Sequence, residues 1–283
     1  MKKASLILEG GATRGVFSAG VLDFLMEKEL YIPYVIGVSA GACNAVDYLS
    51  RQIGRTRDCM IPRDKKNGYM NLKKALKTKS LFDMDMIFDR YPKELFPFDF
   101  KTYQESALRC EMAVTNCLTG KTEYLDDRED EDRLFTICRA SCSMPVVTPM
   151  VEIGGVPYLD GGLSDSVPVA RALREGYKKC VVVLTRNEGY RKKLSHKAAV
   201  IYHSVYKEYP ELVKTICRRP VMYNRTMELI ERLEKEGHIF VLRPFEPAVS
   251  RTEQDPEVLE RFYRHGYDLM ESRYEELLLY LDR

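Results

Sequence analysis

Two strand–loop–helix units within the first 50 residues constrain the fold of this chain more than any other feature. Residues 4–9 form a short apolar run, the glycine-rich residues 10–15 follow, and apolar side chains then recur at a helical spacing up to Leu25. Residues 34–38 form a second apolar run, which passes through Gly37-Val38-Ser39-Ala40-Gly41 into a helix-like stretch. Such units build a mainly parallel sheet with helices on its faces, so the sequence predicts an α/β fold.

Later segments continue this pattern and argue against a separate C-terminal domain. Hairpins are expected from residues 111–117 with 122–125 and from 151–153 with 156–159, further strands at 180–184 and 239–242, and helices at 132–142 and from about 257. After Arg186 the pattern is helical, with breaks expected near Pro210 and Pro220. We expect a catalytic core over residues 1–186 and a mostly helical extension over 187–283 that packs on the same core, with strand 239–242 near the sheet.

Charge is balanced on average but uneven along the chain. The 283 residues include 44 Lys and Arg against 42 Asp and Glu. Nucleic-acid-binding proteins usually carry a strong excess of basic residues, so we expect no nucleic acid partner. Residues 171–219, however, carry 13 basic and 4 acidic residues, a net charge of +9. Two explanations remain open: a solvated helix face, and peripheral contact with an anionic membrane surface.

The N-terminal apolar run and the cysteines both favour a cytoplasmic protein. The run ends at Glu9 after five residues, short of the roughly 7–15 apolar residues of a secretory signal. The eight cysteines include no CxxC pair, and we interpret them as reduced, mostly buried thiols. No metal ion or other cofactor is expected.

The motif Gly37-Val38-Ser39-Ala40-Gly41 is the strongest local signal for chemistry, because it lies between a predicted strand and a predicted helix. A sharp turn there would force Ser39 into a strained backbone conformation, and glycines at 37 and 41 would avoid collisions with neighbouring chain. The serine oxygen would then project at a helix N-terminus, where negative charge is stabilised. Ser39 is therefore a candidate nucleophile, although a glycine-rich packing turn explains the motif equally well.

Two further glycine motifs could complete a site around Ser39. Residues 10–15 offer backbone N–H groups for an oxyanion hole; they also resemble a dinucleotide-binding loop, but the acidic residue expected about 20 positions later is missing. Asp160-Gly161-Gly162 follows a predicted strand and is a candidate base, whereas the four histidines lie late in the chain and outside any motif.

The three motifs, in this order, resemble those of the patatin-like phospholipase family over roughly residues 4–186, with the small-residue stretch 140–145 adding to the likeness. The resemblance implies a three-layer α/β sandwich and a serine acyl hydrolase that cleaves lipid esters through a Ser-Asp dyad without histidine. It makes Ser39 the nucleophile and Asp160 the base, and it assigns the oxyanion loop to Gly10, Gly11, Ala12 and Arg14. The remaining motif glycines are Gly15, Gly37, Gly41, Gly161 and Gly162.

Ala12 departs from the pattern, because many family members have a third glycine there. An alanine still donates its N–H group, but a positive φ at this position would cost about 1 kcal/mol or more. A catalytically weak lipid- or partner-binding protein is therefore the alternative to an active hydrolase. Residues 81–100 are rich in aromatic side chains and broken by prolines, and we expect this segment to supply an acyl-chain pocket through Phe82, Phe88, Phe96 and Phe98.

Overall fold

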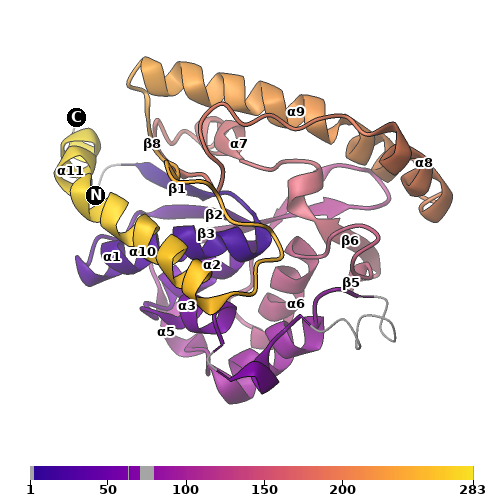
Figure 1. Cartoon of the computed structure of the whole chain (residues 1–283), viewed down its shortest axis with the longest axis horizontal. Helices are drawn as coiled ribbons and strands as arrows, with labels where there is room; N and C mark the ends of the chain where they lie inside the picture. The colour runs from indigo at the N-terminus through magenta and orange to yellow at the C-terminus, as the bar shows by residue number, and fades with distance from the viewer. Residues whose placement is uncertain (1–2, 63, 71–79, 283) are drawn as a thin grey trace.

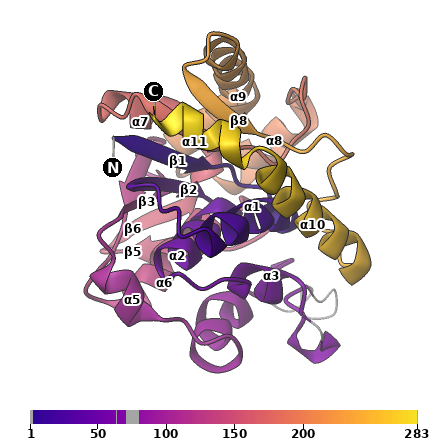
Figure 2. The same cartoon turned by 90° about the vertical axis from the view of Figure 1, so that its left-hand side faces the viewer.

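The structure is a computed structural model that describes residues 3–62, 64–70 and 80–282. Within these residues, eight strands form one mixed sheet between two layers of helices (Figures 1 and 2). The strands are β1 (Ala4–Leu8), β2 (Tyr34–Val38), β3 (Arg109–Asn116), β4 (Thr122–Leu125), β5 (Val151–Ile153), β6 (Val156–Asp160), β7 (Lys179–Val183) and β8 (Ile239–Leu242).

The centre of the sheet is parallel and one end of it is antiparallel. Strands β3, β2, β1, β7 and β8 lie side by side in this order and are parallel. β4 pairs antiparallel with β3, β6 also pairs antiparallel with β3, and β5 pairs with β6. The prediction of an α/β fold with a mainly parallel sheet is confirmed, and both expected hairpins form.

Helices cover both faces of the sheet, and shorter helical turns connect them. The α-helices are α1 (Gly15–Glu27), α2 (Ala40–Leu49), α3 (Arg55–Met60), α5 (Phe100–Glu105), α6 (Glu131–Ser141), α7 (Val169–Arg174), α8 (His196–Val205), α9 (Pro210–Lys235), α10 (Pro256–Ser272) and α11 (Tyr274–Asp282). The remaining helical segments are the short 3₁₀ helices η1 (Ala12–Arg14), η2 (Lys65–Asn67) and η4 (Gly161–Leu163) and the π-helix η3 (Met86–Leu95).

Alternating side chains of the central strands separate two hydrophobic cores. On β1, Leu6 and Leu8 pack into the core shared with α1, α2, α6 and α10, whereas Ile7 packs into the core shared with α7 and α9. The same alternation on β7 sends Val181 to the first core and Val182 to the second. Because successive side chains of a strand point to opposite faces, these continuous apolar runs produce a sheet that is buried on both sides.

The C-terminal segment is built into this architecture through β8 and α10. β8 extends the sheet beside β7, and α10 crosses α1 at very short range. A Cβ atom on Gly20 of α1 would lie 2.1 Å from the carbonyl oxygen of Tyr263, and one on Gly266 of α10 would lie 2.0 Å from that of Phe17. The two helix backbones can approach this closely only because both crossing positions are glycines.

The segment around Pro220 differs from its predicted conformation. α9 runs unbroken through Pro220, because Leu212 and Ile216 before the proline and Tyr223 after it are buried in separate hydrophobic clusters. Part of the aromatic segment 81–100 forms η3, a helix with π-type hydrogen bonds. No helix among the described residues is both long and apolar enough to cross a lipid bilayer.

Candidate active site

Ser39 lies in a sharp turn between β2 and α2. Its φ of 56° and ψ of −125° place it in a region that residues other than glycine rarely adopt. A Cβ atom on Gly37 would lie 2.3 Å from the carbonyl oxygen of Gly41, and one on Gly41 would lie 2.3 Å from that of Leu8. Both flanking positions therefore require glycine, which is the physical reason expected from the sequence for this motif.

The register of β3 brings Asp160 to the end of β2. Met112 and Ala113 of β3 pair with both β2 and β4, while Val114 and Thr115 pair with both β4 and β6. Because β4 occupies one side of β3, β2 and β6 must share the other side. Val38 pairs with Ala113 and Asp160 with the next residue, Val114, so Ser39 and Asp160 emerge at the same point of the sheet.

Two serines at the end of α6 hold these segments together. The Ser141 hydroxyl accepts a hydrogen bond from the Ser39 N–H group (2.9 Å) and donates one to the carbonyl oxygen of Ala113 (2.7 Å). Two residues later, the carbonyl oxygen of Ser143 accepts a hydrogen bond from the Asp160 N–H group (2.7 Å). The small residues of this stretch thus fix both the turn at Ser39 and the strand end at Asp160.

The Asp160 carboxylate is buried, and only one of its two oxygens accepts a hydrogen bond among the described residues. Its Oδ1 accepts a hydrogen bond from the Gly162 N–H group (2.7 Å), while its buried Oδ2 has no hydrogen-bond partner among the described residues. Burial raises the pKa of Asp160, and Arg219, the Ser39 hydroxyl, Gly162 and Lys192 oppose that shift by stabilising the charged form. A carboxylate with a raised pKa and a free oxygen beside a serine can accept a proton from it.

The glycine-rich loop after β1 lies against the turn at Ser39. A Cβ atom on Gly10 would lie 2.7 Å from the Cβ of Ser39, and one on Gly15 would lie 2.8 Å from the Cβ of Ala40. In the described part of the chain, the N–H groups of Gly10, Gly11 and Ala12 donate to no protein acceptor. They are therefore available to a ligand beside Ser39.

Ala12 adopts a φ of 51° and so takes the left-handed conformation that favours glycine. Gly161 is confined as closely as the glycines beside Ser39, because its Cβ atom would lie 2.1 Å from the carbonyl oxygen of Ala113. The loop is also anchored by Glu9, whose carboxylate accepts hydrogen bonds from the Thr185 N–H group (2.7 Å) and the Tyr223 hydroxyl (3.0 Å).

Ser39 lies on the walls of two cavities of different character. A polar cavity of about 550 Å³ has Ser39, Asp160 and the loop residues Gly10, Gly11, Ala12 and Arg14 in its wall. An apolar cavity of about 120 Å³ is lined by Ser39, Ala12 and side chains that include Phe82, Phe88 and Met84. Phe82 and Met144 also border both cavities.

Phe96 and Phe98 are not among the residues that line the apolar cavity. Phe96 packs edge-on against Tyr91, and Phe98 packs edge-on against Phe135, with the Arg55 guanidinium 5.2 Å from the Phe98 ring centre. Both aromatic side chains stabilise the segment that follows η3, whereas Phe82 and Phe88 face the cavity.

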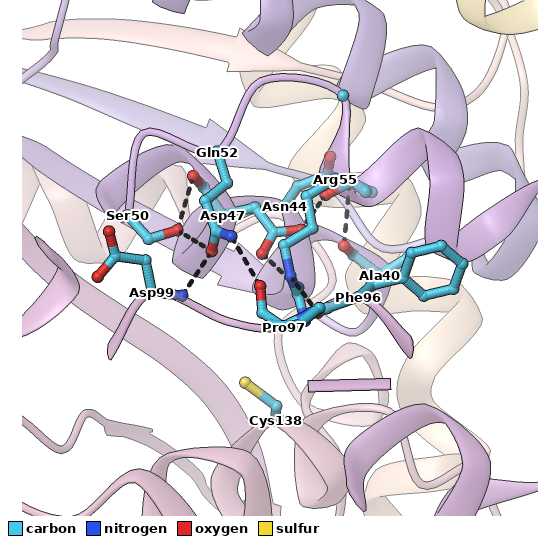
Figure 3. A network of polar contacts seen from close by, with 12 residues as sticks. Ala40, Asn44, Asp47, Ser50, Gln52, Arg55, Phe96, Pro97, Asp99 and Cys138 are labelled. Carbon is cyan, nitrogen blue, oxygen red and sulfur yellow. Dashed lines mark hydrogen bonds and ion pairs between the residues drawn. The ribbon is translucent and has the colours of Figure 1, made fainter. Parts of the chain in front are cut away.

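A polar network holds the segment that follows η3 against α2 and α3 (Figure 3). The Arg55 guanidinium donates to the carbonyl oxygen of Phe96 (3.0 Å) and forms an ion pair with Asp47 (2.6 Å). The Gln52 side chain donates to the carbonyl oxygen of Pro97 (2.9 Å) and accepts from the Asp99 N–H group (2.9 Å). Arg55 and Asp47 also border the apolar cavity, so the network supports one of its walls.

Several residues at this site carried no recognisable signal in the sequence. Ser141 lay within a stretch noted for its small residues, but nothing distinguished its hydroxyl. Lys192 and Arg219 belonged to the basic segment 171–219 and were not expected near Asp160. Of the four histidines, His196 lines the polar cavity, and no hydrogen bond joins it to Ser39 or Asp160 among the described residues.

Comparison with known proteins agrees with this geometry. A family model described as patatin-like phospholipase matches residues 6–173, more than half of the chain. The chain belongs to the patatin-like phospholipase family. A second model, described as a domain of unknown function (DUF6363), matches residues 209–282 of the chain.

Two known proteins are similar to this chain. YjjU of Escherichia coli (strain K12), described as an uncharacterized protein, is 29% identical over 197 residues, which are 65% of this chain and 52% of YjjU. The chain thus spans about half the length of this curated relative. The crystal structure of VipD from Legionella pneumophila matches with a TM-score of 0.53 and 15% identity, over 96% of this chain and 67% of VipD. At that identity the likeness concerns the fold, and it confirms the patatin-like architecture.

Proposed function

We propose that this protein hydrolyses carboxylic esters of lipids through a dyad of Ser39 and Asp160. The observation that carries the proposal is the buried Asp160 Oδ2, which has no partner in the described part of the chain and belongs to a carboxylate whose charge the Ser39 hydroxyl stabilises. Leaving a buried carboxylate oxygen unsatisfied is costly in a structural residue, whereas a general base needs a free oxygen beside the group that it deprotonates.

The reaction proceeds in two steps with Asp160 as the proton carrier. Ser39 Oγ attacks the ester carbonyl while its proton moves to Asp160 Oδ2, and the resulting oxyanion accepts hydrogen bonds from the free N–H groups of Gly10, Gly11 and Ala12. The tetrahedral intermediate collapses, the C–O bond to the alcohol breaks, and Asp160 returns the proton to the departing alkoxide. A water molecule then gives a proton to Asp160 and attacks the acyl-enzyme. The bond between the acyl carbon and Ser39 Oγ breaks, Asp160 returns the proton to Ser39 Oγ, and the fatty acid leaves.

The apolar cavity is the proposed site of the acyl chain. Its wall includes Phe82 and Phe88 and reaches Ser39, so an acyl group bound there would present its carbonyl carbon to the serine. The polar cavity on the other side of Ser39 remains for the alcohol portion of the ester.

Covalent labelling with a fluorophosphonate probe tests the dyad. We expect native protein to be labelled, Ser39→Ala protein to remain unlabelled, and Asp160→Asn protein to react about 10²–10⁴-fold more slowly, the usual effect of removing a general base. His196→Ala is the matched control, since this histidine lines the same cavity, and it should be labelled at close to the native rate. Normal labelling of Asp160→Asn together with loss of labelling in His196→Ala would show that a histidine is the base.

The same experiment addresses the alternative of a catalytically weak binding protein, which is favoured by the strained φ of 51° at Ala12. Native protein that is folded and binds a fatty acid, but is not labelled and hydrolyses no acyl ester, would establish that alternative.

A further inference from the structure

Six Lys and Arg side chains of the described residues contribute to the wall of the polar cavity. The basic cluster consists of Arg14, Arg186, Lys192, Lys193, Arg219 and Arg251. Arg14 belongs to η1 and Arg219 to α9, while the others come from loops after β7, before α8 and after β8. Segments far apart in the sequence therefore place their charges around one space of about 550 Å³, beside Ser39 and Asp160.

The cluster has unused hydrogen-bond donors. Arg14 is 5% exposed, and the buried Nε atoms of Arg14 and Arg219 have no acceptor among the described residues. The Lys192 ammonium group has a neutral contact, a hydrogen bond to the Ser166 hydroxyl (3.3 Å). Buried guanidinium groups normally have an anionic or carbonyl partner, so donors left free in a cavity wall indicate that a ligand completes them.

The carboxylates in the same wall do not neutralise the cluster. Glu9 accepts hydrogen bonds from Thr185 and Tyr223, and Asp160 accepts one from Gly162. Arg219 and Lys192 also stabilise the charge of Asp160. Six cations nevertheless face two carboxylates, so the wall keeps an excess of positive charge.

The cations also repel one another. Burial, and then the charge of Arg186, lower the pKa of Arg14 to about 10. Burial, and then the charge of Arg219, lower the pKa of Lys192. Like charges held together away from water are unfavourable unless an anion joins them, and a bound anion would reverse these shifts.

Two of the tyrosine rings in this wall already face cations. Tyrosine rings are the usual partners of quaternary ammonium groups, but the Arg186 guanidinium lies 4.2 Å from the ring centre of Tyr190 and the Lys192 ammonium 3.5 Å from that of Tyr223. Because cations outnumber carboxylates in this wall by six to two, the cluster favours a purely anionic group over a zwitterionic one such as phosphocholine. Four arginines and two lysines match the several oxygens of a phosphate monoester.

We propose that the basic cluster binds a phosphate monoester on the alcohol portion of the ester substrate, so that the protein prefers acyl esters with an anionic phosphate headgroup. The proposal rests on the proposed function, because it uses Ser39 as the point where the acyl cavity and the headgroup cavity meet. Five of the six cations lie beyond residue 173, where the match to the patatin-like phospholipase model ends. The headgroup preference is thus a property of the C-terminal part of this chain.

A binding experiment tests the cluster without requiring catalysis. Calorimetry on Ser39→Ala protein should show that glycerol 3-phosphate binds at least about tenfold more tightly than glycerophosphocholine or inorganic phosphate. Arg251→Gln and Arg186→Gln should each weaken glycerol 3-phosphate binding by about tenfold or more, as expected for the loss of a charge-assisted contact. Arg218→Gln is the matched control, because this neighbouring arginine of α9 is exposed and lies outside the cavity wall, and it should bind normally.

A kinetic experiment then tests the headgroup assignment. The substrates are a 1-acylglycerol 3-phosphate, the 1-monoacylglycerol and the lysophosphatidylcholine with the same acyl chain. We expect kcat/KM to be at least about tenfold higher for the phosphate monoester, and this ratio to fall by about tenfold in Arg251→Gln but not in Arg218→Gln.

The outcomes separate this proposal from the proposed function. Ester hydrolysis without a phosphate preference, and without binding of glycerol 3-phosphate, would overturn the headgroup assignment and leave the hydrolase standing. Specific binding of glycerol 3-phosphate by a protein that hydrolyses none of the three esters would support the cluster as a phosphate site and contradict the proposed function. Equally tight binding of inorganic phosphate and glycerol 3-phosphate, with no kinetic preference, would make the cluster a site for free phosphate and refute the assignment.

Discussion

Replacing Ser141 by alanine tests whether one buried hydroxyl holds the proposed active site together. This hydroxyl accepts a hydrogen bond from the Ser39 N–H group (2.9 Å) and donates one to the carbonyl oxygen of Ala113 (2.7 Å), and the side chain is 0% exposed. A buried polar group that loses its partner costs about 1–3 kcal/mol. With two such groups affected, Ser141→Ala should lower the free energy of unfolding by roughly 2–4 kcal/mol.

Ser143→Ala is a closely matched control. Ser143 is the same residue type, is also 0% exposed, and lies two positions away. Its hydroxyl donates to the carbonyl oxygen of Arg139 (2.8 Å), which also accepts a hydrogen bond from the Cys142 N–H group (3.2 Å) and so keeps a partner. Losing this hydroxyl should cost about 0.5–1.5 kcal/mol, the net value of an ordinary hydrogen bond.

Urea unfolding and ester hydrolysis by the two variants provide the measurement. The urea curves should differ by about 2 kcal/mol, and in a thermal melt this corresponds to a Tm about 3–4 °C lower for Ser141→Ala than for Ser143→Ala in a chain of this size. Because Ser141 also holds Ser39 at its unusual φ of 56°, kcat should fall about tenfold or more in Ser141→Ala and by less than about twofold in Ser143→Ala. Equal losses of stability in the two variants, or native kcat in Ser141→Ala, would refute this reasoning.

Four further predictions concern pH, backbone strain and the acyl cavity. Because burial raises the pKa of Asp160, kcat/KM should rise with pH through a value above the usual 3.8 of an aspartate, and Asp160→Asn should lack this limb. Burial also raises the pKa of Asp23 from 3.8 to about 6. Between these two pH values the folded state binds more protons than the unfolded state. The free energy of unfolding should therefore fall by about 3 kcal/mol as the pH rises from 3.8 to about 6. Asp23→Asn should remove that slope in urea titrations at a series of pH values. Ala12→Gly should raise the free energy of unfolding by about 0.5–1 kcal/mol without lowering kcat, because it relieves the φ of 51°, and a loss of stability would show that the alanine is not strained. Phe82→Ala should change the ratio of kcat/KM for long and short acyl esters by about tenfold, whereas Phe96→Ala should leave it unchanged; equal effects of the two changes would argue against the apolar cavity as the acyl site.

The turn at Ser39 could be predicted because its causes are local. Two glycines around a serine, between an apolar run and a helical pattern, already imply a tight strand-to-helix connection. The physical reason is that a Cβ atom on Gly37 or Gly41 would collide with neighbouring backbone. The role of Ser141 could not be predicted in the same way. Its hydroxyl contacts Ser39 across 102 positions of sequence, and this contact depends on the place of α6 beside the end of β2.

The basic segment shows why a charge count does not predict where charges point. Arg191 and Lys192 are adjacent in sequence, yet Arg191 forms an ion pair with Glu231 (2.7 Å) while Lys192 faces the polar cavity. Arg171, in the same segment, pairs with Glu111 (2.9 Å). The sequence predicts a charged surface from all of these residues together, whereas the fold divides them between ion pairs and a cavity wall.

Substrate preference depends on where the aromatic segment near η3 and the basic segment before α9 lie relative to each other. The sequence of neither segment alone specifies that arrangement. The aromatic residues near η3 predict an apolar pocket and the cations before α9 predict attraction to anions, but each property alone fits many surface or core roles. Both properties bear on the substrate because Ser39 borders both cavities. An ester bound across the serine must place its acyl chain on one side and its alcohol on the other. The apolar cavity and the cavity lined by cations would therefore select opposite ends of one molecule. Mutations in the two segments should therefore affect different properties of the substrate, chain length for Phe82 and headgroup charge for Arg251, even though both act at the same serine.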